Sequence, residues 1–286
     1  MAKAGDLFIV ATPIGNLGDI TLRALQTLKQ VDLIAAEDTR HSSKLLNHYD
    51  IQTPTVSLHN YNETKRSQFI LKQLQQGKNI ALITDAGTPL ISDPGYCLVK
   101  IIKENGLKVI PIPGACAAIV ALSASGLATN KFIFEGFLPI KSKQQITYLQ
   151  QLVNETRTMI FYESPHRLLA TVKNMQTVFG QDRHMVIAKE LTKTFETLYR
   201  DTILATYNWL IAAPERQKGE FVLLVAGCDA TAIDNITKNR ALDPQTLRIL
   251  ELLAKTLPFK QAVTLTAQIT GANKNQLYKA CCHHSV

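Results

Sequence analysis

Short apolar runs alternate with amphipathic stretches over the first 126 residues of the chain. Between the runs, apolar side chains recur at spacings of three and four, which is typical of helices with one buried face. This alternation predicts βα units around a largely parallel sheet, and therefore an α/β fold class. The predicted strands are Leu7–Thr12, Leu33–Ala36, Thr55–Leu58, Ile80–Thr84 and Lys108–Pro111. The predicted helices are Thr21–Gln30, Ser42–Tyr49, Glu63–Gln76, Gly95–Asn105 and Ala115–Ser125.

The same rhythm restarts after Gly126 and predicts a second α/β domain. Its predicted strands are Phe132–Phe134, Thr158–Tyr162, Met185–Ala188 and Glu220–Ala226, and its predicted helices are Lys143–Val153 and Arg167–Phe179. We therefore expect an N-terminal α/β domain with a parallel sheet over residues 1–126 and a second α/β domain over residues 127–230.

A small helical domain is expected over residues 238–286. The stretch Asp229–Pro244 is rich in Asp, Thr and Asn, as linkers often are. Helical patterns follow at Pro244–Leu257, Pro258–Thr270 and Lys274–Cys282. The turn at Gly271 between the last two gives the pattern of a helix-turn-helix. A plain three-helix packing domain is the alternative interpretation.

The charge of the chain is concentrated near its end. Lys and Arg number 31 against 23 Asp and Glu, a formal net charge of +8. From Lys238 onward, seven basic residues stand against two acidic ones. A basic tail of this kind favours contact with a polyanion such as a nucleic acid. A solvated helical surface is the alternative.

Several classes of protein are disfavoured by the sequence. No run of roughly 18 apolar residues occurs, so no membrane-spanning helix is expected. The apolar run Leu7–Val10 is too short for a signal peptide, which favours a cytoplasmic location. The five cysteines form no Cys-x-x-Cys pair, so we expect neither a structural zinc site nor a disulfide framework. The sequence assigns no role to Cys281, Cys282, His283 and His284.

Three loops that follow predicted strands are rich in Gly and Pro: Thr12–Asp19, Thr84–Gly95 and Pro111–Ala118. Glycine lets the backbone approach a ligand closely, and proline lowers the entropy cost of ordering a loop. Ligands gather at the carboxyl ends of parallel strands. The first loop fits neither the Gly-x-Gly-x-x-Gly dinucleotide pattern nor a Gly-Lys-Ser/Thr phosphate loop. We expect a rigid socket for a ligand with amino, carboxylate and ribose groups.

Charged clusters also follow predicted strands, at Glu37–His41, Tyr162–Arg167 and Lys189–Lys193. Taken alone, each charged residue is best explained as a surface ion-pair partner. Their common position at strand ends favours a functional interpretation, because surface helices scatter charges instead.

Together these segments resemble those of the RsmI family, bacterial 16S ribosomal RNA (cytidine-2′-O)-methyltransferases of the tetrapyrrole methylase superfamily. The matching segments are Thr12–Asp19, Glu37–His41, Asp85–Gly95, Pro113–Ala118, Glu135–Pro139, Tyr162–Arg167 and Lys189–Lys193. The resemblance implies two α/β domains of the tetrapyrrole methylase type plus a helix-turn-helix-like domain. It further implies S-adenosyl-L-methionine as cofactor, a homodimer, and a target cytidine in the decoding centre of the small ribosomal subunit.

Two positions refine this resemblance. Ala115 stands where the family is expected to have the second proline of Pro-Gly-Pro, which loosens the turn without excluding ligand binding. Thr88 stands where tetrapyrrole enzymes tend to have the Asp of Gly-Asp-Pro, which favours the ribosomal branch.

The resemblance places the methyl donor between the two α/β domains. The expected cofactor-binding residues are Pro13, Gly15, Asn16, Asp85, Gly87, Thr88, Pro89, Ile91, Ser92, Ala115, Ala117, Ala118, Phe161 and Tyr162. No metal is expected, because a sulfonium is already a good leaving group.

The ribose hydroxyl must lose its proton during or after attack, and a carboxylate, a histidine or water can accept it. The candidate acceptors are Asp38, His41 and Glu190, which the sequence does not rank. We expect Arg40, Arg167 and Lys189 to hold phosphates or to acidify the hydroxyl. The tail is expected to anchor RNA phosphates through Lys260, Lys274 and Lys279.

Two other functions remain open at the level of the sequence. One is a tetrapyrrole (precorrin-type) C-methyltransferase, which needs no basic helical tail. The other is a nucleic-acid-binding regulator whose α/β part senses a small ligand.

Overall fold

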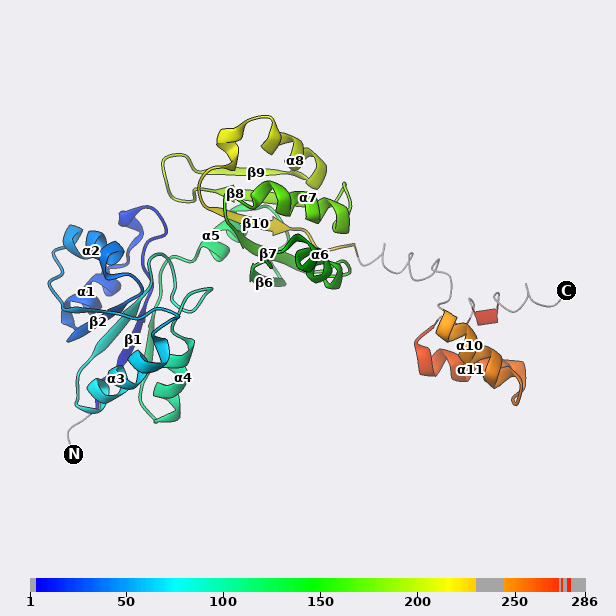
Figure 1. Ribbon diagram of the computed structural model, residues 1–286, viewed down its shortest axis with the longest axis horizontal. Helices are drawn as coiled ribbons and strands as arrows, with labels where there is room; N and C mark the ends of the chain where they lie inside the picture. Colours follow the sequence, from blue (N-terminus) through cyan, green and yellow to red (C-terminus); the bar gives the residue numbers. More distant parts are fainter. Residues whose placement is uncertain (1–3, 230–243, 273, 275–276, 279–286) are drawn as a thin grey trace. The chain divides into compact units, whose positions relative to one another are not determined.

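The computed structural model describes residues 4–229, 244–272, 274 and 277–278. The chain forms two compact units, Met1–Gly227 and Cys228–Val286, each with a hydrophobic core of its own. The first unit contains two five-stranded sheets flanked by helices (Figure 1). We call the part built on the first sheet the first half and the part built on the second sheet the second half. The boundary expected between residues 126 and 127 stays a prediction.

The first sheet is parallel throughout, with the strand order β3-β2-β4-β1-β5. Its strands are β1 (Leu7–Val10), β2 (Leu33–Ala36), β3 (Thr55–Ser57), β4 (Ile80–Ile83) and β5 (Val109–Ile112). The helices of this half are α1 (Leu22–Gln30), α2 (Thr39–His48), α3 (Glu63–Gln75), α4 (Tyr96–Glu104) and α5 (Ala117–Ala124), with a short 3-10 helix η1 (Leu17–Asp19). The predicted alternation and the parallel sheet are confirmed.

Helices cover both faces of this sheet, which explains why its strands are apolar at successive positions. In β4, Ile80 and Leu82 pack into the core formed with α3 and α4. Ala81 and Ile83 point the other way, into the core formed with α1 and α2. All four side chains are buried. Because the faces are covered, the strand ends and their loops are left for ligands.

The second sheet is mixed, with the order β6-β7-β10-β8-β9. Only β6 and β7 run parallel, and the other neighbours are antiparallel. Its strands are β6 (Phe132–Phe137), β7 (Thr158–Glu163), β8 (His184–Lys189), β9 (Thr197–Thr202) and β10 (Phe221–Val225). Its helices are α6 (Ser142–Gln151), α7 (Leu168–Phe179) and α8 (Ile203–Ile211), followed by the 3-10 helix η2 (Pro214–Gln217).

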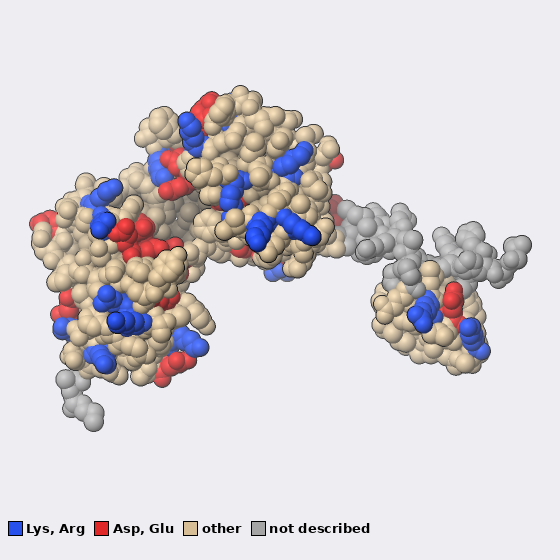
Figure 2. Space-filling view, viewed as in Figure 1, with Lys and Arg blue, Asp and Glu red and all other residues tan. Residues whose placement is uncertain are grey.

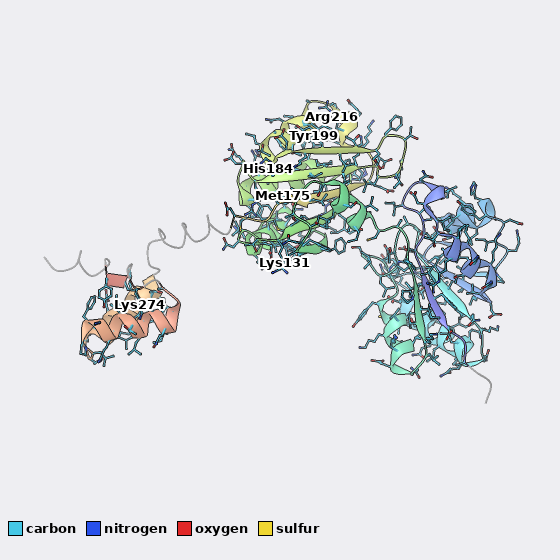
Figure 3. The ribbon with its side chains drawn as sticks, turned by 180° about the vertical axis from the view of Figure 1, so that it is seen from behind. Lys131, Met175, His184, Tyr199, Arg216 and Lys274 are labelled. Atoms are coloured by element: carbon cyan, nitrogen blue, oxygen red, sulfur yellow. The ribbon has the colours of Figure 1, made fainter. Side chains whose placement is uncertain are left out.

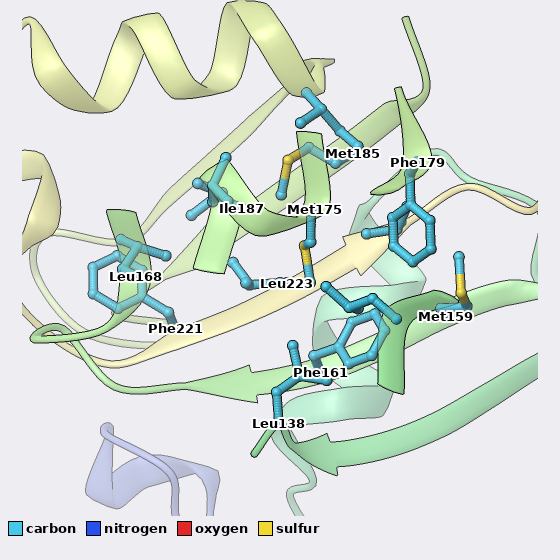
Figure 4. Packing of buried hydrophobic residues seen from close by; sticks show 14 of the residues in the cluster. Leu138, Met159, Phe161, Leu168, Met175, Phe179, Met185, Ile187, Phe221 and Leu223 are labelled. Carbon is cyan, nitrogen blue, oxygen red and sulfur yellow. The ribbon is translucent and has the colours of Figure 1, made fainter. Parts of the chain in front are cut away.

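Each face of the second sheet has its own core. On one face, Met159 and Phe161 of β7 share a core with apolar side chains of α6, α7 and α8, among them Met175 of α7 (Figure 4). On the other face, Ala118 and Leu122 of α5 pack among apolar side chains of β7, β8 and β10. Since α5 follows the last strand of the first sheet, this packing fastens the two halves together.

The strand β9 and the helix α8 were not predicted from the sequence. Leu198 and Arg200 on the edge strand β9 are exposed, so the strand lacks an apolar run. The side chains that pack against β9 come from later in the chain, so only the structure reveals them. Tyr199 stacks on Trp209 of α8 with ring centres 4.3 Å apart, and the Arg216 guanidinium lies 4.8 Å from the Trp209 ring centre. Figure 3 labels Tyr199 and Arg216, which lie near each other at the β9 edge of the second sheet.

The second unit contains α10 (Pro244–Ala254) and α11 (Phe259–Thr270). Leu250, Ala262, Val263 and Leu277 form its small core. Helix α11 ends at Thr270 and is followed by Gly271, whose φ of 72° is the left-handed conformation typical of a glycine C-cap. The first two predicted helices of this region are present. The third, Lys274–Cys282, lies mostly outside the described residues.

Candidate functional site

The three Gly- and Pro-rich loops of the first sheet lie together at its carboxyl edge. The N–H of Thr12 donates to the Gly87 carbonyl at 2.9 Å, and the N–H of Gly87 donates back at 3.1 Å. The Thr88 hydroxyl donates to the carbonyl of Ala115 at 2.9 Å. The loop after β4 is therefore tied to the loops after β1 and β5.

The loop after β4 holds an unusual backbone. Gly87 has a φ of +85°, and a Cβ there would lie 3.3 Å from the Ile14 Cγ2 atom. Leu90 and Ser92 have φ values of 74° and 70°, which side-chain-bearing residues rarely adopt. Strain of this kind is concentrated at functional sites, where the surrounding structure enforces it.

A cavity of about 380 Å³ opens beside these loops, and both halves of the first unit line it. This volume lies in the range of small-molecule sites. The first half contributes Ile14, Ala86, Gly87, Thr88, Ile91, Ser92, Asp93, Cys116 and Ala117. The second half contributes Phe137, Tyr162, Glu163, Ser164, Pro165, Ala188, Leu191, Glu220, Phe221 and Val222.

Tyr162 forms an aromatic wall of the cavity. Its ring makes edge-to-face contacts with Phe134 and Phe137, with ring centres 5.0 and 5.7 Å away. Its hydroxyl accepts a hydrogen bond from the Ala118 N–H at 3.2 Å. Burial, with the neighbouring Cys116, raises the pKa of Tyr162 above its ordinary value, so the phenol stays protonated.

Some of the expected cofactor-binding residues line the cavity and others do not. Those that line it are Gly87, Thr88, Ile91, Ser92, Ala117 and Tyr162. The others do not line it. Six of them belong to the same loops and one to the first turn of α5, namely Pro13, Gly15, Asn16, Asp85, Pro89 and Ala115, and Ala118. Phe161 is fully buried in the core under α6 and α7, because successive residues of β7 point to opposite faces (Figure 4).

Gly15 and Asn16 contact the second half of the unit. The N–H of Asn16 donates to the Thr192 hydroxyl at 3.1 Å. A Cβ on Gly15 would lie 2.6 Å from the Lys193 Cγ atom and 3.0 Å from the Leu191 carbonyl oxygen. Glycine at position 15 therefore permits the loop after β8 to close against the loop after β1.

Carboxylates gather where β2 and β4 end. The Asp38 N–H donates to Asp85 Oδ1 at 3.2 Å, and the Asp85 N–H donates to Glu37 Oε2 at 3.5 Å. Figure 2 shows acidic side chains grouped on the surface of the first half. Burial and the charge of Asp85 raise the pKa of Glu37.

Asp93, which sequence reasoning left out of the site, lies in the cavity wall next to this group. Burial, together with the charges of Glu37 and Asp85, raises the pKa of Asp93 from 3.8 to about 6. Its position in the segment Asp85–Gly95 was the only sequence signal for it.

The predicted proton acceptors lie outside the cavity wall. Asp38 caps α2, accepting the Arg40 N–H at 2.8 Å. His41 and Arg40 are exposed on the same helix. Glu190 accepts hydrogen bonds from the Lys193 ammonium at 3.0 Å and from the Glu220 N–H at 2.8 Å. Burial opposes the shift, but these donors lower the pKa of Glu190 and make it a weaker base.

Two of the cations expected to face the substrate, Arg167 and Lys189, have partners within the protein. Arg167 pairs with the buried Glu163, Nε to Oε1 at 3.1 Å, and donates to the Leu138 carbonyl at 2.8 Å. The Lys189 ammonium donates to the Glu215 carbonyl at 2.7 Å. In the second unit, Lys260 and Lys274 are exposed, whereas Lys279 lies outside the described residues. The expected contacts of these side chains with RNA stay predictions.

The cavity suits S-adenosylmethionine in three respects. Its walls are largely apolar, as an adenosyl group requires. Gly87 lines the cavity and has no side chain, so a ligand can approach its backbone closely. The Asp93 carboxyl in the cavity wall complements a cationic ligand. Within the described residues, no group of three or more His, Cys, Asp and Glu side chains is arranged to hold a metal ion.

Comparison with known proteins agrees with this arrangement. The profile of the Tetrapyrrole (Corrin/Porphyrin) Methylases matches residues 6–205, and that of the RsmI C-terminal HTH domain matches residues 240–282. A relative from Haemophilus influenzae named ribosomal RNA small subunit methyltransferase I is 54% identical over 96% of this chain and 95% of its own length. Relatives of the same name from Pasteurella multocida and a Synechocystis species are 51% and 48% identical, covering 98% and 96% of both chains.

Solved structures show the same fold at low identity. The cobalt precorrin-4 methyltransferase CbiF aligns with a TM-score of 0.57 at 17% identity, over 77% of this chain and 94% of its own. A diphthine synthase aligns with a TM-score of 0.59 at 12% identity, over 78% and 90%. The predicted fold class, two α/β parts with a helix-turn-helix domain, is confirmed. The chain is a methyltransferase that belongs to the tetrapyrrole methylase family and, within it, to the group named ribosomal RNA small subunit methyltransferase I.

Proposed function

We propose that this enzyme transfers a methyl group from S-adenosylmethionine to the 2′-oxygen of a cytidine ribose in 16S ribosomal RNA, within the decoding centre. The observation that carries the proposal is the cavity between the strained loop after β4 and the aromatic wall at Tyr162. The bound cofactor supplies a sulfonium methyl group, which needs no further activation. The protein has to hold donor and acceptor in line, and such positioning contributes several kcal/mol of barrier reduction.

The second unit supports RNA as the substrate rather than a tetrapyrrole. Its profile match is to a helix-turn-helix domain, and Lys260 and Lys274 are exposed there. A substrate with many phosphates gains affinity from such cations. The tetrapyrrole enzymes resemble this chain only in fold, at 17% identity or less.

The assembly and the location follow from the same proposal. We also propose that the enzyme works as a homodimer, the assembly that the family resemblance implies. The enzyme acts in the cytoplasm, where its proposed substrate, 16S ribosomal RNA of the small subunit, is found. No helix within the described residues has the length and apolar character needed to cross a bilayer.

A labelling experiment tests the substrate directly. The full-length protein is incubated with methyl-labelled S-adenosylmethionine and, separately, small ribosomal subunits, free 16S ribosomal RNA and a precorrin-type tetrapyrrole. We expect label on one cytidine ribose 2′-oxygen in a ribosomal sample, located by nuclease digestion and mass spectrometry. Label on the tetrapyrrole, or on a base rather than a ribose, contradicts the proposal.

A further inference from the structure

Three carboxylates line the cavity, and they differ in their partners. Glu163 forms an ion pair with Arg167 and accepts a hydrogen bond from the Thr171 hydroxyl at 2.6 Å. Glu220 lies 3.1 Å from the Lys193 ammonium and is largely exposed. Asp93 has no ion-pair partner in the described part of the chain. Of the three, Asp93 is the one whose carboxylate is free to take a proton from a ligand.

The groups facing Asp93 come from several elements. Glu37, with Asp38 beside it, follows β2, and Asp85 follows β4. Across the cavity, Asp93 acts electrostatically on the Tyr162 phenol of β7, which also faces Cys116 at the start of α5. His59, after β3, acts on Glu37 with the opposite sign. The Thr84 hydroxyl opposes the upward shift of the Asp93 pKa, but burial and the two carboxylates outweigh it.

We propose that Asp93 is the catalytic residue that accepts the proton of the attacking ribose hydroxyl, a role that rests on the proposed function. A lone pair of the 2′-oxygen forms the new O–CH₃ bond, and the electron pair of the broken C–S bond stays on sulfur, which leaves as a neutral thioether. The hydroxyl proton moves to an Asp93 carboxylate oxygen and then to water.

The structure favours Asp93 over the acceptors suggested by the sequence. Asp38 is occupied as the N-cap of α2, and Glu190 is held by Lys193 and the Glu220 N–H. None of Asp38, His41 and Glu190 lines the cavity. A general base works best when its pKa lies a little below the operating pH, and Asp93, with a pKa of about 6, meets this condition at pH 7 to 8.

The test compares full-length wild-type enzyme with Asp93→Asn, a substitution of nearly equal size. Turnover at saturating ribosomal RNA is measured from pH 5 to pH 9, and donor affinity is measured by calorimetry. For the wild type, log kcat should rise with unit slope below about pH 6 and level off above it, because the base must be ionised. For Asp93→Asn, we expect the break to disappear and the plateau to fall by about 10²- to 10⁴-fold, with a loss of donor affinity far smaller than the loss of turnover.

Glu37→Gln serves as the matched control. It removes a negative charge beside Asp93 but keeps an oxygen that can accept the Asp85 N–H. Asp93 then ionises more easily, so the break in log kcat should move to lower pH while the height of the plateau is retained. A break that stays in place shows that it does not report Asp93 and overturns the proposal.

Two further results would also overturn it. One is an Asp93→Asn enzyme that turns over within threefold of the wild type. The other is a loss of donor affinity equal to the loss of turnover, since Asp93 would then bind the donor instead. Wild-type enzyme that labels no ribose 2′-oxygen contradicts the proposed function itself, and the role of Asp93 falls with it.

Discussion

The role of each carboxylate in this protein depends on its ion-pair and hydrogen-bond partners. Glu163 is buried but paired with Arg167, so it fixes the start of α7. Glu190 has two donors and holds the loop after β8. Asp93 lies near Glu37 and Asp85, and among the described residues it has no ion-pair partner. An ionised side chain in that position lowers the stability of the folded protein. Groups with perturbed pKa values of this kind are common at functional sites.

The ionised Asp93 carboxylate should lower the free energy of unfolding, and this effect should depend on pH. Its pKa rises from 3.8 in the unfolded chain to about 6 in the folded protein, so ionisation disfavours folding as the pH rises from 4 to 6. Asp93→Asn removes this penalty. We expect the variant to melt at a higher temperature than the wild type at pH 8, with the difference vanishing near pH 4. Calorimetric melting at both pH values checks this.

The exposed Asp182→Asn is the control for removing a carboxylate as such. It should leave the melting temperature unchanged at both pH values. An Asp93→Asn protein that is less stable than the wild type at pH 8 would show that the Asp93 carboxylate is stabilised by a partner.

At the scale of elements, the sequence predicted the first half well because its strands are buried on both faces. Ile80–Ile83 is apolar throughout, and such a run is easily recognised between amphipathic helices. The edge strand β9 was missed because partly buried and exposed side chains alternate along most of it, so it contains no apolar run. The three loops of the site were predicted from Gly and Pro. Asp93 was missed because its environment arises from Glu37, which lies 56 residues earlier in the chain.

The contact between the loop after β1 and the loop after β8 is a second feature that was not predicted from the sequence. Gly15→Ala should force the loop after β8 away from the loop after β1, because its Cβ would overlap Lys193 and approach the Leu191 backbone. We expect a loss of about 1–3 kcal/mol in the free energy of unfolding, measured with urea. Gly18→Ala in the same loop is the control, since its nearest contact is a side-chain oxygen at 3.3 Å. Equal effects of the two substitutions would contradict the role assigned to Gly15.

At the scale of the whole molecule, we propose that the chain separates donor binding from RNA anchoring. The cavity belongs to the first unit, and the exposed cations Lys260 and Lys274 belong to the second. The two functions should therefore respond to different substitutions.

The double variant Lys260→Gln/Lys274→Gln tests this separation. If both lysines bind phosphates, the slope of log affinity for RNA against log salt should become shallower by about 0.7–0.9 for each lysine replaced. Donor affinity should be unchanged. Lys72→Gln, an exposed position on α3, is the control and should leave the slope as it is. An unchanged slope in the double variant would exclude these lysines as anchors.

Calorimetric titration with S-adenosylmethionine tests the central claim most directly, namely that the cavity of the first unit binds the donor. The wild type should bind one molecule per chain. Ala117→Leu places a larger side chain in the cavity wall and should weaken binding at least about tenfold, the change that 1.4 kcal/mol produces. Ala124→Leu, at the exposed end of the same helix, should bind like the wild type. Absence of binding to the wild type, or full affinity in Ala117→Leu, would contradict the account.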